Sequence, residues 1–502
     1  MPKASPVPTR SSPSPGAGPF ATVTALPDIA AAVAALPGPV ALLGYGVEGR
    51  ETLRFLRRHR QPQRHGAGDL RVHDRNFSQG LPADAAEFPD VRFDGEPGWE
   101  ARLAEARTVI RSAGVRPDLP PLERARHRGA QVLSATQLFL RLAPGPVAGV
   151  TGTLGKGTTV TLIGEALGAA GLPYRLGGNI GLNPLAFLDE LTPDMRVVLE
   201  LSSFQLMDLR DHHPRVAVVL RTTSEHLDWH RDVTEYRRAK QGLIAPRAAG
   251  QRVIFCADSP GSREVVGAAA DEAWAVSLRE PVAEGIGLDS AGSLCRYHGG
   301  HAVPLPDLAR LALPGGFNRE NAAAALLAAE ALGAAPAVAL AGIRAFPGLP
   351  HRLERVGRVG GVTCYNDSYA TRPDATLGAV SAFAEPLVLI VGGSEKHADF
   401  RGLMEALCGH PSLRLILFMG TTGPRMQNEL AAAARRLGRD VPPHRQVADL
   451  PAAVRDGLAA LAGVDGGGVL LMSPACASFD MFPNYTVRGE RFRELVTAAG
   501  TT

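Results

Sequence analysis

The 502-residue sequence contains very little lysine. Only four lysines are present, Lys3, Lys156, Lys240 and Lys396, so 49 of the 53 basic residues are arginine. Arginine therefore supplies the generic positive charge. A retained lysine indicates chemistry that a guanidinium group cannot perform, because only the amine is a compact charge that can react as a nucleophile or form a carbamate. Three of the four lysines lie in motif-like sequence and become candidate functional residues.

Cysteine, long apolar runs and excess charge are also scarce. The five cysteines are odd in number, scattered and without C-x-x-C spacing, which predicts a reduced, cytoplasmic protein. No stretch reaches the roughly 18 apolar residues of a membrane span, so we expect no membrane insertion. The net charge of +3 argues against a nucleic-acid partner, which usually shows as basic clusters.

The N-terminal region carries a glycine-rich turn between a strand and a helix. Residues 40–43 form an apolar run, residues 44–49 read G-Y-G-V-E-G, and a helical pattern covers residues 51–58. A second strand pattern, at residues 70–73, ends in Asp74. This order is typical of a Rossmann-type unit, in which glycines lie under a pyrophosphate and an acid contacts a ribose or base. A purely structural glycine turn remains the alternative, because this motif alone is a weak signal.

A second glycine-rich turn follows an apolar strand that starts at Val147. Residues 150–159 read V-T-G-T-L-G-K-G-T-T, and a helical pattern follows. Glycines let backbone N–H groups approach an anion, the helix N-terminus adds positive potential, and Lys156 supplies a point charge for the β- and γ-phosphates. The stretch predicts a nucleotide-phosphate loop. A tight turn with a surface lysine is the alternative.

Polar residues follow the next two buried strands. The first strand ends at Glu200, where a carboxylate beside a phosphate loop suits Mg²⁺, although a partly exposed acid beside a turn would give the same pattern. The second strand precedes His226, Asp228 and His230, which we expect to form a polar cluster.

Lys240 falls on a helical pattern that begins near residue 232. Burying one unpaired lysine costs on the order of several kcal/mol, because the ion loses its hydration and gains no partner. We therefore expect Lys240 to be paired, neutral or chemically modified. A salt bridge on the helix face with Glu235 or Asp232 is the alternative, but arginine would serve that purpose in this sequence.

Strand and helix patterns alternate through the rest of the chain. Residues 321–341 form a long alanine-rich segment that is predicted to be helical. Apolar strand patterns that end in small polar residues lie at residues 362–365, 387–391, 413–419 and 469–472. Alternation of this kind predicts a doubly wound, mostly parallel sheet whose strand-end loops face one way. We predict an α/β protein with a disordered tail over residues 1–24 and three domains: Rossmann-like at 25–135, P-loop ATPase-like with a mostly parallel sheet at 136–346, and Rossmann-like at 347–502.

Several motifs, taken in order and spacing, resemble the Mur ligases of peptidoglycan synthesis. They are G-T-L-G-K at residues 152–156, G-G-N-I-G at 177–181, L-E-L-S-S-F-Q-L from 199, E-H-L-D-W-H from 225, the pair Ala239-Lys240, G-L-P-H-R-L-E from 348 and S-P-A-C-A-S-F-D from 473. The resemblance covers essentially everything from about residue 38 onward.

The resemblance implies a cytoplasmic ligase that uses ATP and Mg²⁺, with two metal sites, to add D-glutamate to UDP-N-acetylmuramoyl-L-alanine through an acyl phosphate. The first domain would bind the UDP end of the substrate, the second ATP, and the third the incoming amino acid. Lys240 as its carbamate would offer the oxygen donors that a hard metal prefers. Its partners would be small molecules only, and the chain would act as a monomer.

The resemblance also implies site residues, position by position. The catalytic residues would be Lys156, Glu200, His226 and Lys240, and the metal ligands Thr158, Glu200, His226 and Lys240. Positions that match ATP contacts are Gly152, Thr153, Gly155, Lys156, Gly157, Thr158, Thr159, Asn318, Asn321, Arg352 and Asp367. Positions that match the UDP-sugar site are Gly46, Val47, Glu48, Gly49, Asp74, Ser112, Gly114 and Asn179. The amino-acid pocket would contain Thr371, Arg372, Lys396, Ser478, Phe479 and Tyr485.

Some positions depart from the family pattern. In the phosphate loop, Leu154 replaces the usual Asn and Gly157 occupies a hydroxyl position. Phe317 stands where His is frequent, and Arg221 where Asn is frequent. Tyr369 replaces a lysine that ordinarily helps to hold glutamate, and Arg372 could restore the positive charge.

Two alternatives follow. The first is a ligase of the same architecture that adds L-glutamate or another amino acid, such as a folylpolyglutamate synthase, which lacks the N-terminal domain that this chain is predicted to have. The second is a non-catalytic nucleotide-binding regulator. Retention of Lys156, Glu200, His226 and Lys240 argues against the regulator.

Overall fold

The structure is a computed structural model that describes residues 28–60, 69–95, 98–179, 182–244, 250–311, 313–395 and 397–500. The predicted tail at residues 1–24 and Lys396 lie outside the described residues. Among the residues described, no helix combines the length and apolar character needed to cross a membrane.

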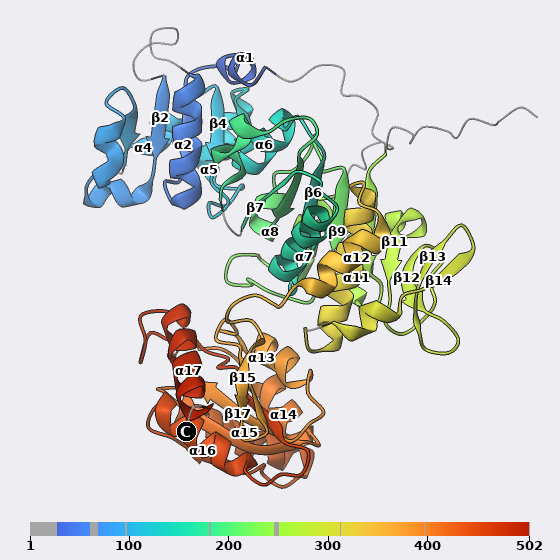
Figure 1. Cartoon of the computed structure of the whole chain (residues 1–502). Coiled ribbons are helices and arrows are strands. Elements are labelled where there is room, and N and C mark those ends of the chain that lie inside the picture. Colours follow the sequence, from blue (N-terminus) through green and yellow to red (C-terminus); the bar gives the residue numbers. More distant parts are fainter. Residues whose placement is uncertain are drawn as a thin grey trace, which may run out of the picture.

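Three sheets follow one another along the chain (Figure 1), and the first has five parallel strands. In spatial order they are β3 (Arg92–Asp94), β2 (Leu70–His73), β1 (Val40–Leu43), β4 (Thr108–Arg111) and β5 (Gln131–Ser134). The accompanying helices are α1 (Ile29–Ala34), α2 (Val47–His59), α4 (Trp99–Leu103), α5 (Pro120–His127) and α6 (Ala135–Leu142). This strand order is that of a Rossmann-type sheet, as predicted, and places the turn after β1 between β2 and β4.

The second sheet has nine strands, parallel from β7 to β12 and antiparallel at its far edge. In spatial order they are β14 (His301–Pro304), β13 (Leu294–His298), β12 (Gly285–Leu288), β11 (Trp274–Val276), β10 (Arg252–Cys256), β9 (Val216–Val219), β6 (Val147–Thr151), β8 (Arg196–Glu200) and β7 (Tyr174–Gly178). The accompanying α-helices are α7 (Lys156–Ala169), α8 (Ser203–Leu206), α9 (Val233–Gln241), α10 (Pro260–Val266), α11 (Gly316–Ala331) and α12 (Pro336–Ala345). Strand β6 is buried throughout, as expected for a central parallel strand covered on both faces.

The third sheet has six strands, parallel except for the edge strand β15. In spatial order they are β15 (Glu354–Val359), β16 (Val362–Asn366), β20 (Gly468–Met472), β17 (Leu387–Gly392), β18 (Leu413–Met419) and β19 (His444–Gln446). Its helices are α13 (Pro373–Val380), α14 (Arg401–Gly409), α15 (Gly423–Leu437), α16 (Leu450–Leu461) and α17 (Tyr485–Gly500). The predicted α/β class with mostly parallel sheets is confirmed. The exact domain boundaries stay a prediction.

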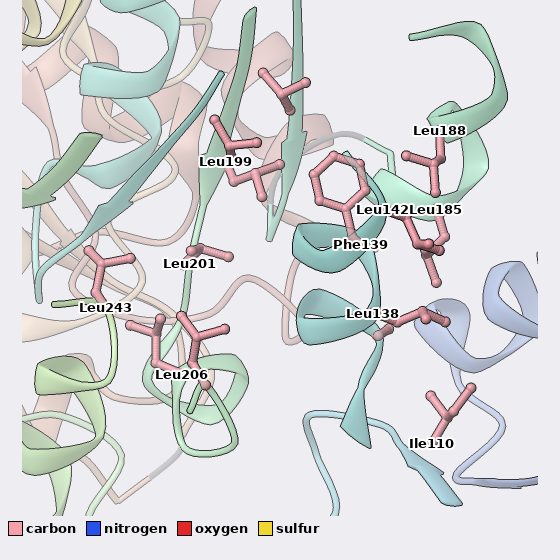
Figure 2. Packing of buried hydrophobic residues seen from close by; sticks show 14 of the residues in the cluster. Ile110, Leu138, Phe139, Leu142, Leu185, Leu188, Leu199, Leu201, Leu206 and Leu243 are labelled. Carbon is pink, nitrogen blue, oxygen red and sulfur yellow. The ribbon is translucent and has the colours of Figure 1, made fainter. Parts of the chain in front are cut away.

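The first two sheets share one apolar cluster besides a cluster of their own on each, whereas the third sheet has only separate cores among the described residues. A continuous cluster of buried side chains runs from Val33 to Ala273. Helix α6 joins the two halves of this cluster, because Phe139 packs edge-on against Phe187 at 6.1 Å, beside Leu185 and Leu188 (Figure 2). Two other clusters, around β17 and β20, belong to the third sheet. The orange and red C-terminal part is accordingly set apart from the rest in Figure 1.

The alanine-rich segment at residues 321–341 is helical, as predicted, except for one break that was not predicted. The segment forms two helices, α11 and α12, separated by a turn over residues 332–335. Gly333 adopts a left-handed φ of 98° in that turn, and Pro336 begins α12. A left-handed glycine ends a helix and a proline is favoured at the start of the next. The alanine content concealed these two signals.

Candidate active site

One cavity of about 1100 Å³ lies between the second sheet and the C-terminal part of the chain. Its wall comes largely from loops that follow β6, β7, β8, β9 and β16, together with the start of α11. All five strands end at this cavity with their carboxyl ends, which is where open parallel sheets bind ligands.

The predicted phosphate loop forms the floor of the cavity. It runs from the end of β6 to the start of α7, and Gly155 caps the helix with a left-handed φ of 88°. A Cβ on Gly155 would lie 2.2 Å from Asn321 Oδ1, so only glycine allows α11 to approach the loop. Lys156 folds back and donates to the carbonyl oxygens of Gly152 at 3.0 Å and Thr153 at 2.9 Å. The free N–H groups of α7 complete a site suited to an anion.

The two residues after Lys156 face different surroundings. Gly157 has no side chain, and a Cβ there would approach Arg352 Nη1 and Glu200 Oε2 to 3.2 Å. The Thr158 hydroxyl accepts a hydrogen bond from Arg352 Nη1 at 3.3 Å. The Arg352 guanidinium also lies 4.3 Å from the centre of the Tyr369 ring. Gly157 therefore leaves room for a guanidinium group above the helix start.

Glu200 ends β8 beside the phosphate loop, as predicted. Its side chain is buried, and Oε1 accepts a hydrogen bond from Asn179 Nδ2 at 3.1 Å. Oε2 is also buried and accepts no hydrogen bond from the described residues. A buried carboxylate oxygen without a partner is costly unless a cation or donor completes it. Asn179, which the resemblance assigns to the UDP-sugar site, lies at this point too.

The predicted cluster of His226, Asp228 and His230 forms only in part. His226 lines the cavity and adopts a left-handed φ of 57°, and burial lowers its pKa. His230 turns away, bonds Ser203 Oγ at 2.8 Å through Nε2 and stacks on the ring of Phe204. Asp228 is exposed. The expectation of a three-residue cluster is wrong, because the turn faces His226 to the cavity, buries His230 against Ser203 and leaves Asp228 exposed.

Lys240 is fully enclosed at the edge of the cavity. Its exposed fraction is 1%, and Nζ donates to the Gly152 carbonyl at 2.9 Å and to Thr151 Oγ1 at 3.3 Å. The ammonium also lies 4.5 Å from the centre of the Tyr236 ring. No carboxylate of the described residues forms an ion pair with it, so the alternative of a helix-face salt bridge is wrong. Burial, together with the charge of Lys156, lowers its pKa well below the ordinary value.

The donor set around Glu200 fits Mg²⁺ that is shared with phosphates. In the part of the chain that the structure describes, no three His, Cys, Asp or Glu side chains gather into a metal cage. Mg²⁺ usually keeps several waters and takes one or two carboxylates plus substrate phosphates. The unpartnered Glu200 oxygen and the Thr158 hydroxyl both line the cavity beside the phosphate loop. His226 and Lys240 line the same cavity.

Residues predicted to contact ATP lie on two further sides of the cavity. Asn318 and Asn321, on α11, are buried, and Asn321 Nδ2 donates to Asn318 Oδ1 at 3.4 Å. Asp367 follows β16 and accepts hydrogen bonds from Ser473 Oγ at 2.7 Å and from the Leu353 backbone N–H at 3.1 Å. Burial raises the pKa of Asp367 to about 7.

The residues predicted for the amino-acid pocket separate into two groups. Thr371, Arg372 and Tyr485 line the cavity. Ser478 is buried in the loop after β20 and Phe479 is exposed there, and neither lines the cavity. The Arg372 guanidinium forms an ion pair with Glu225 of the central part of the chain.

The predicted UDP-sugar residues other than Asn179 lie at the carboxyl edge of the first sheet. Asp74 Oδ2 accepts from the Tyr45 backbone N–H at 2.7 Å, and Glu48 Oε2 accepts from the Ala113 N–H at 2.9 Å. Ser112 Oγ donates to the Gly44 carbonyl at 2.9 Å. The remaining predicted residues lie on the same loops: Gly46, which caps α2, Val47, which is 81% exposed, Gly49 and Gly114.

Comparison with known proteins identifies the family. The Mur ligase middle domain model matches residues 150–329, and the Mur ligase, glutamate ligase domain model matches residues 351–476. The chain is 35% identical to a UDP-N-acetylmuramoylalanine--D-glutamate ligase of Symbiobacterium thermophilum, over 91% of this chain and 97% of that one. It is 38% identical to the enzyme of the same name from Anaeromyxobacter dehalogenans, over 85% and 92%. The chain belongs to the Mur ligase family.

A solved Mur ligase structure supports the fold. The crystal structure of MurF ligase from Thermotoga maritima in complex with ADP aligns with a TM-score of 0.53 and 17% identity, over 92% of this chain and 95% of that one. At this identity the likeness shows the fold alone.

One departure from the Mur ligase pattern has a local partner. Arg221, where Asn is frequent, pairs with Glu320 of α11 at 3.2 Å. Glu320 is buried, and burial raises its pKa. The added guanidinium therefore balances a buried acid at the cavity wall.

Sequence reasoning missed three residues beside the Mur ligase site. They are Arg116, Glu225 and Trp229, and each contacts a residue of another part of the chain. Glu225 and Trp229 lie within the motif at residues 225–230, but nothing in the local pattern shows their distant partners. Arg116 carries no sequence signal, because one arginine among 49 is not conspicuous.

Proposed function

We propose that this Mur ligase adds D-glutamate to UDP-N-acetylmuramoyl-L-alanine, with hydrolysis of ATP to ADP and phosphate, during peptidoglycan precursor synthesis. The observation that carries the proposal is the single cavity in which the phosphate loop, Glu200, His226 and Lys240 face Thr371 and Arg372 of the C-terminal part. Relatives that carry the name of this activity span nearly the whole chain.

The first chemical step activates a carboxylate. The terminal alanine carboxylate is a poor acyl donor, so one of its oxygens attacks the γ-phosphorus of ATP, and an acyl phosphate and ADP form. Charge on the phosphoryl oxygens makes positioning and cations the main source of catalysis. Lys156, the N–H groups at the start of α7 and Arg352 are the groups of this chain that would hold the phosphates.

Glu200, Thr158 and His226 would hold two Mg²⁺ ions together with Lys240 as its carbamate. The metal would neutralise phosphate charge and orient the oxygens. The environment of Lys240 supports the modification, since burial without a carboxylate partner favours the neutral amine, the form that can add CO₂. A carbamate would replace an isolated cation by an oxygen donor.

The second chemical step forms the amide. The amine of D-glutamate attacks the acyl carbon, and the tetrahedral intermediate expels phosphate. Arg372, Thr371 and Tyr485 line the side of the cavity from which the amino acid would enter, and Arg372 would bind a carboxylate in place of the lysine that Tyr369 replaces. Ser478, Phe479 and Lys396 remain proposed contacts of the second carboxylate.

The UDP end would bind at the carboxyl edge of the first sheet. Gly46, Val47 and the other loop residues present backbone N–H groups at the N-terminus of α2, which suits a pyrophosphate. Presence of this five-stranded sheet favours a UDP-linked substrate over a folate substrate. The proposal includes a monomeric enzyme of the cytoplasm that acts on small molecules.

Phosphate release measures this function directly. Protein, ATP and Mg²⁺ are mixed with UDP-N-acetylmuramoyl-L-alanine and with D-glutamate, L-glutamate or no amino acid. Release that requires D-glutamate supports the proposal. A preference for L-glutamate would indicate the related ligase that Tyr369 leaves open, and no release under any condition would favour a non-catalytic protein.

A further inference from the structure

A short segment of the N-terminal part, residues 112–118, contacts both proposed ligand sites. At one end, Ser112 Oγ donates to the Gly44 carbonyl and the Ala113 N–H donates to Glu48. These bonds attach the segment to the glycine loop of the proposed UDP site. Between Gly114 and Asp118, the same segment contacts the loop over residues 226–231, which carries His226.

Arg116 contacts both that loop, at Trp229, and the helix after it, at Glu235 of α9. Its Nη1 donates to the Trp229 carbonyl at 2.5 Å, and its guanidinium lies 4.9 Å from the centre of the Trp229 ring. Nη2 and Nη1 also bond the two carboxylate oxygens of Glu235 at 2.9 and 3.2 Å. Nε and Nη2 bond Asp118 at 2.8 and 2.9 Å. One guanidinium therefore holds three acceptors and an aromatic face, which a lysine ammonium could not do in one plane.

The charges around Arg116 are balanced and strongly paired. Arg231 pairs with Asp118, and its backbone N–H donates to Glu235 at 2.8 Å. Hydrogen bonds from Arg116 hold the pKa of both Asp118 and Glu235 down at about 2. Both acids therefore stay charged at neutral pH.

The 226–231 loop is held from two sides. Within the central part, His230 bonds Ser203, and Phe204 packs against the rings of His226, Trp229 and His230. His226 adopts a left-handed φ of 57°, a strained conformation for a residue other than glycine, which persists only where the surroundings enforce it. The Trp229 and His230 N–H groups both return to the His226 carbonyl. Trp229 Nε1 donates to the Gly114 carbonyl at 3.1 Å. The strained His226 backbone is thus held from the N-terminal part as well, through Gly114 and Arg116.

We propose that Arg116 is a positioning residue that couples the two ends of the site: it fixes His226 to the segment bordering the UDP loop, so that binding of the UDP substrate strengthens binding of the metal–nucleotide. The proposal rests on the proposed function for the identity of the two ligands. The physical connection is a short chain of hydrogen bonds from Gly44 and Glu48 through residues 112–116 to Trp229. Binding free energies coupled in this way must be reciprocal.

Calorimetry tests the proposal without turnover. The dissociation constant of a non-hydrolysable ATP analogue with Mg²⁺ is measured with and without UDP-N-acetylmuramoyl-L-alanine. We expect the UDP compound to tighten nucleotide binding by about 5-fold or more in the wild-type protein. The ratio of the dissociation constant measured without the UDP compound to that measured with it should fall to about one in Arg116→Ala. Each ligand alone should bind this variant within about 2-fold of wild type.

Two further variants separate positioning from folding. Arg124→Ala removes an exposed arginine of the same part of the chain, paired with Glu100, and should keep the wild-type ratio. Trp229→Phe removes only the bond to Gly114 and keeps an aromatic ring beneath Arg116. Trp229→Phe should lower the ratio of dissociation constants, and it provides the test of the proposal if Arg116→Ala does not fold.

Each outcome decides between the alternatives. A wild-type ratio in Arg116→Ala or in Trp229→Phe would overturn the coupling and leave the proposed function intact. A ratio of one in the wild-type protein, when both ligands bind, would also overturn the coupling and leave the proposed function intact. Failure of the wild-type protein to bind the UDP compound would overturn the proposed function, and the coupling with it.

Discussion

Lys156 and Lys240 donate hydrogen bonds to the same carbonyl oxygen, that of Gly152, at 3.0 and 2.9 Å. Two ammonium groups on one acceptor repel each other, and no carboxylate of the described residues forms an ion pair with either. Burial and the charge of Lys156 together lower the pKa of Lys240, the fully buried lysine of the two. The lowered pKa favours the neutral amine of Lys240, which is the form that can add CO₂ to give a carbamate.

Lys240→Ala should abolish ligation, a loss of about 100-fold or more, as for other groups that stabilise transition-state charge. A short carboxylic acid such as acetate should recover part of the activity, because its oxygens stand in for the carbamate. Phosphate release measures both effects, and Lys240→Arg, which keeps a charge but cannot be carbamylated, should stay inactive. Rescue by a short amine instead would contradict the carbamate.

Glu200→Gln should stabilise the ligand-free protein while it reduces activity. Glu200 Oε2 is buried without a hydrogen-bond partner, so the neutral amide removes a desolvated charge. Loss of the proposed Mg²⁺ ligand should lower the rate by about 100-fold or more. Thermal melting and phosphate release are the measurements. A lower melting temperature of the variant would show that the buried carboxylate does not destabilise the ligand-free protein.

Asp367→Asn should flatten the dependence of stability on pH. Burial raises the folded-state pKa of Asp367 from 3.8 to about 7, so between these values the folded protein binds more protons than the unfolded chain. The stabilising contribution is complete below the unfolded value and is lost as pH rises through about 7. The melting temperature of the wild-type protein should therefore fall more between pH 5 and 8 than that of the variant. Parallel curves would contradict this pKa.

Arg372→Ala should raise the KM for D-glutamate by about 10-fold or more, the equivalent of about 1.4 kcal/mol, with little change in the KM for ATP. The reason is the loss of the cation proposed to bind a carboxylate of the amino acid. Tyr369→Lys in the same variant should restore affinity, because it returns the usual lysine. Arg414→Ala, an exposed arginine on β18, serves as the control. An unchanged KM for D-glutamate would place the carboxylate elsewhere.

Local patterns predicted those features that depend on neighbouring residues. The strand at residues 40–43 and the glycine turn after it, the phosphate loop with Lys156, and Glu200 at a strand end all occur as expected, because parallel strands and glycine turns have strong local signals. The motif order also indicated the family. The break between α11 and α12 was missed, since alanine content outweighed Gly333 and Pro336.

By itself, the sequence determined the elements, the class of fold, the family and the candidate residues, because hydrophobic period, glycine position and motif spacing are properties of short stretches. Only the tertiary structure decided which side chains meet. It enclosed Lys240 without a carboxylate, turned His230 away from His226, paired Arg372 with Glu225 and placed Arg116 on Trp229. These contacts join residues far apart in the chain. Tertiary packing decides which charged groups are paired and which are left unpaired, and no local pattern encodes that packing.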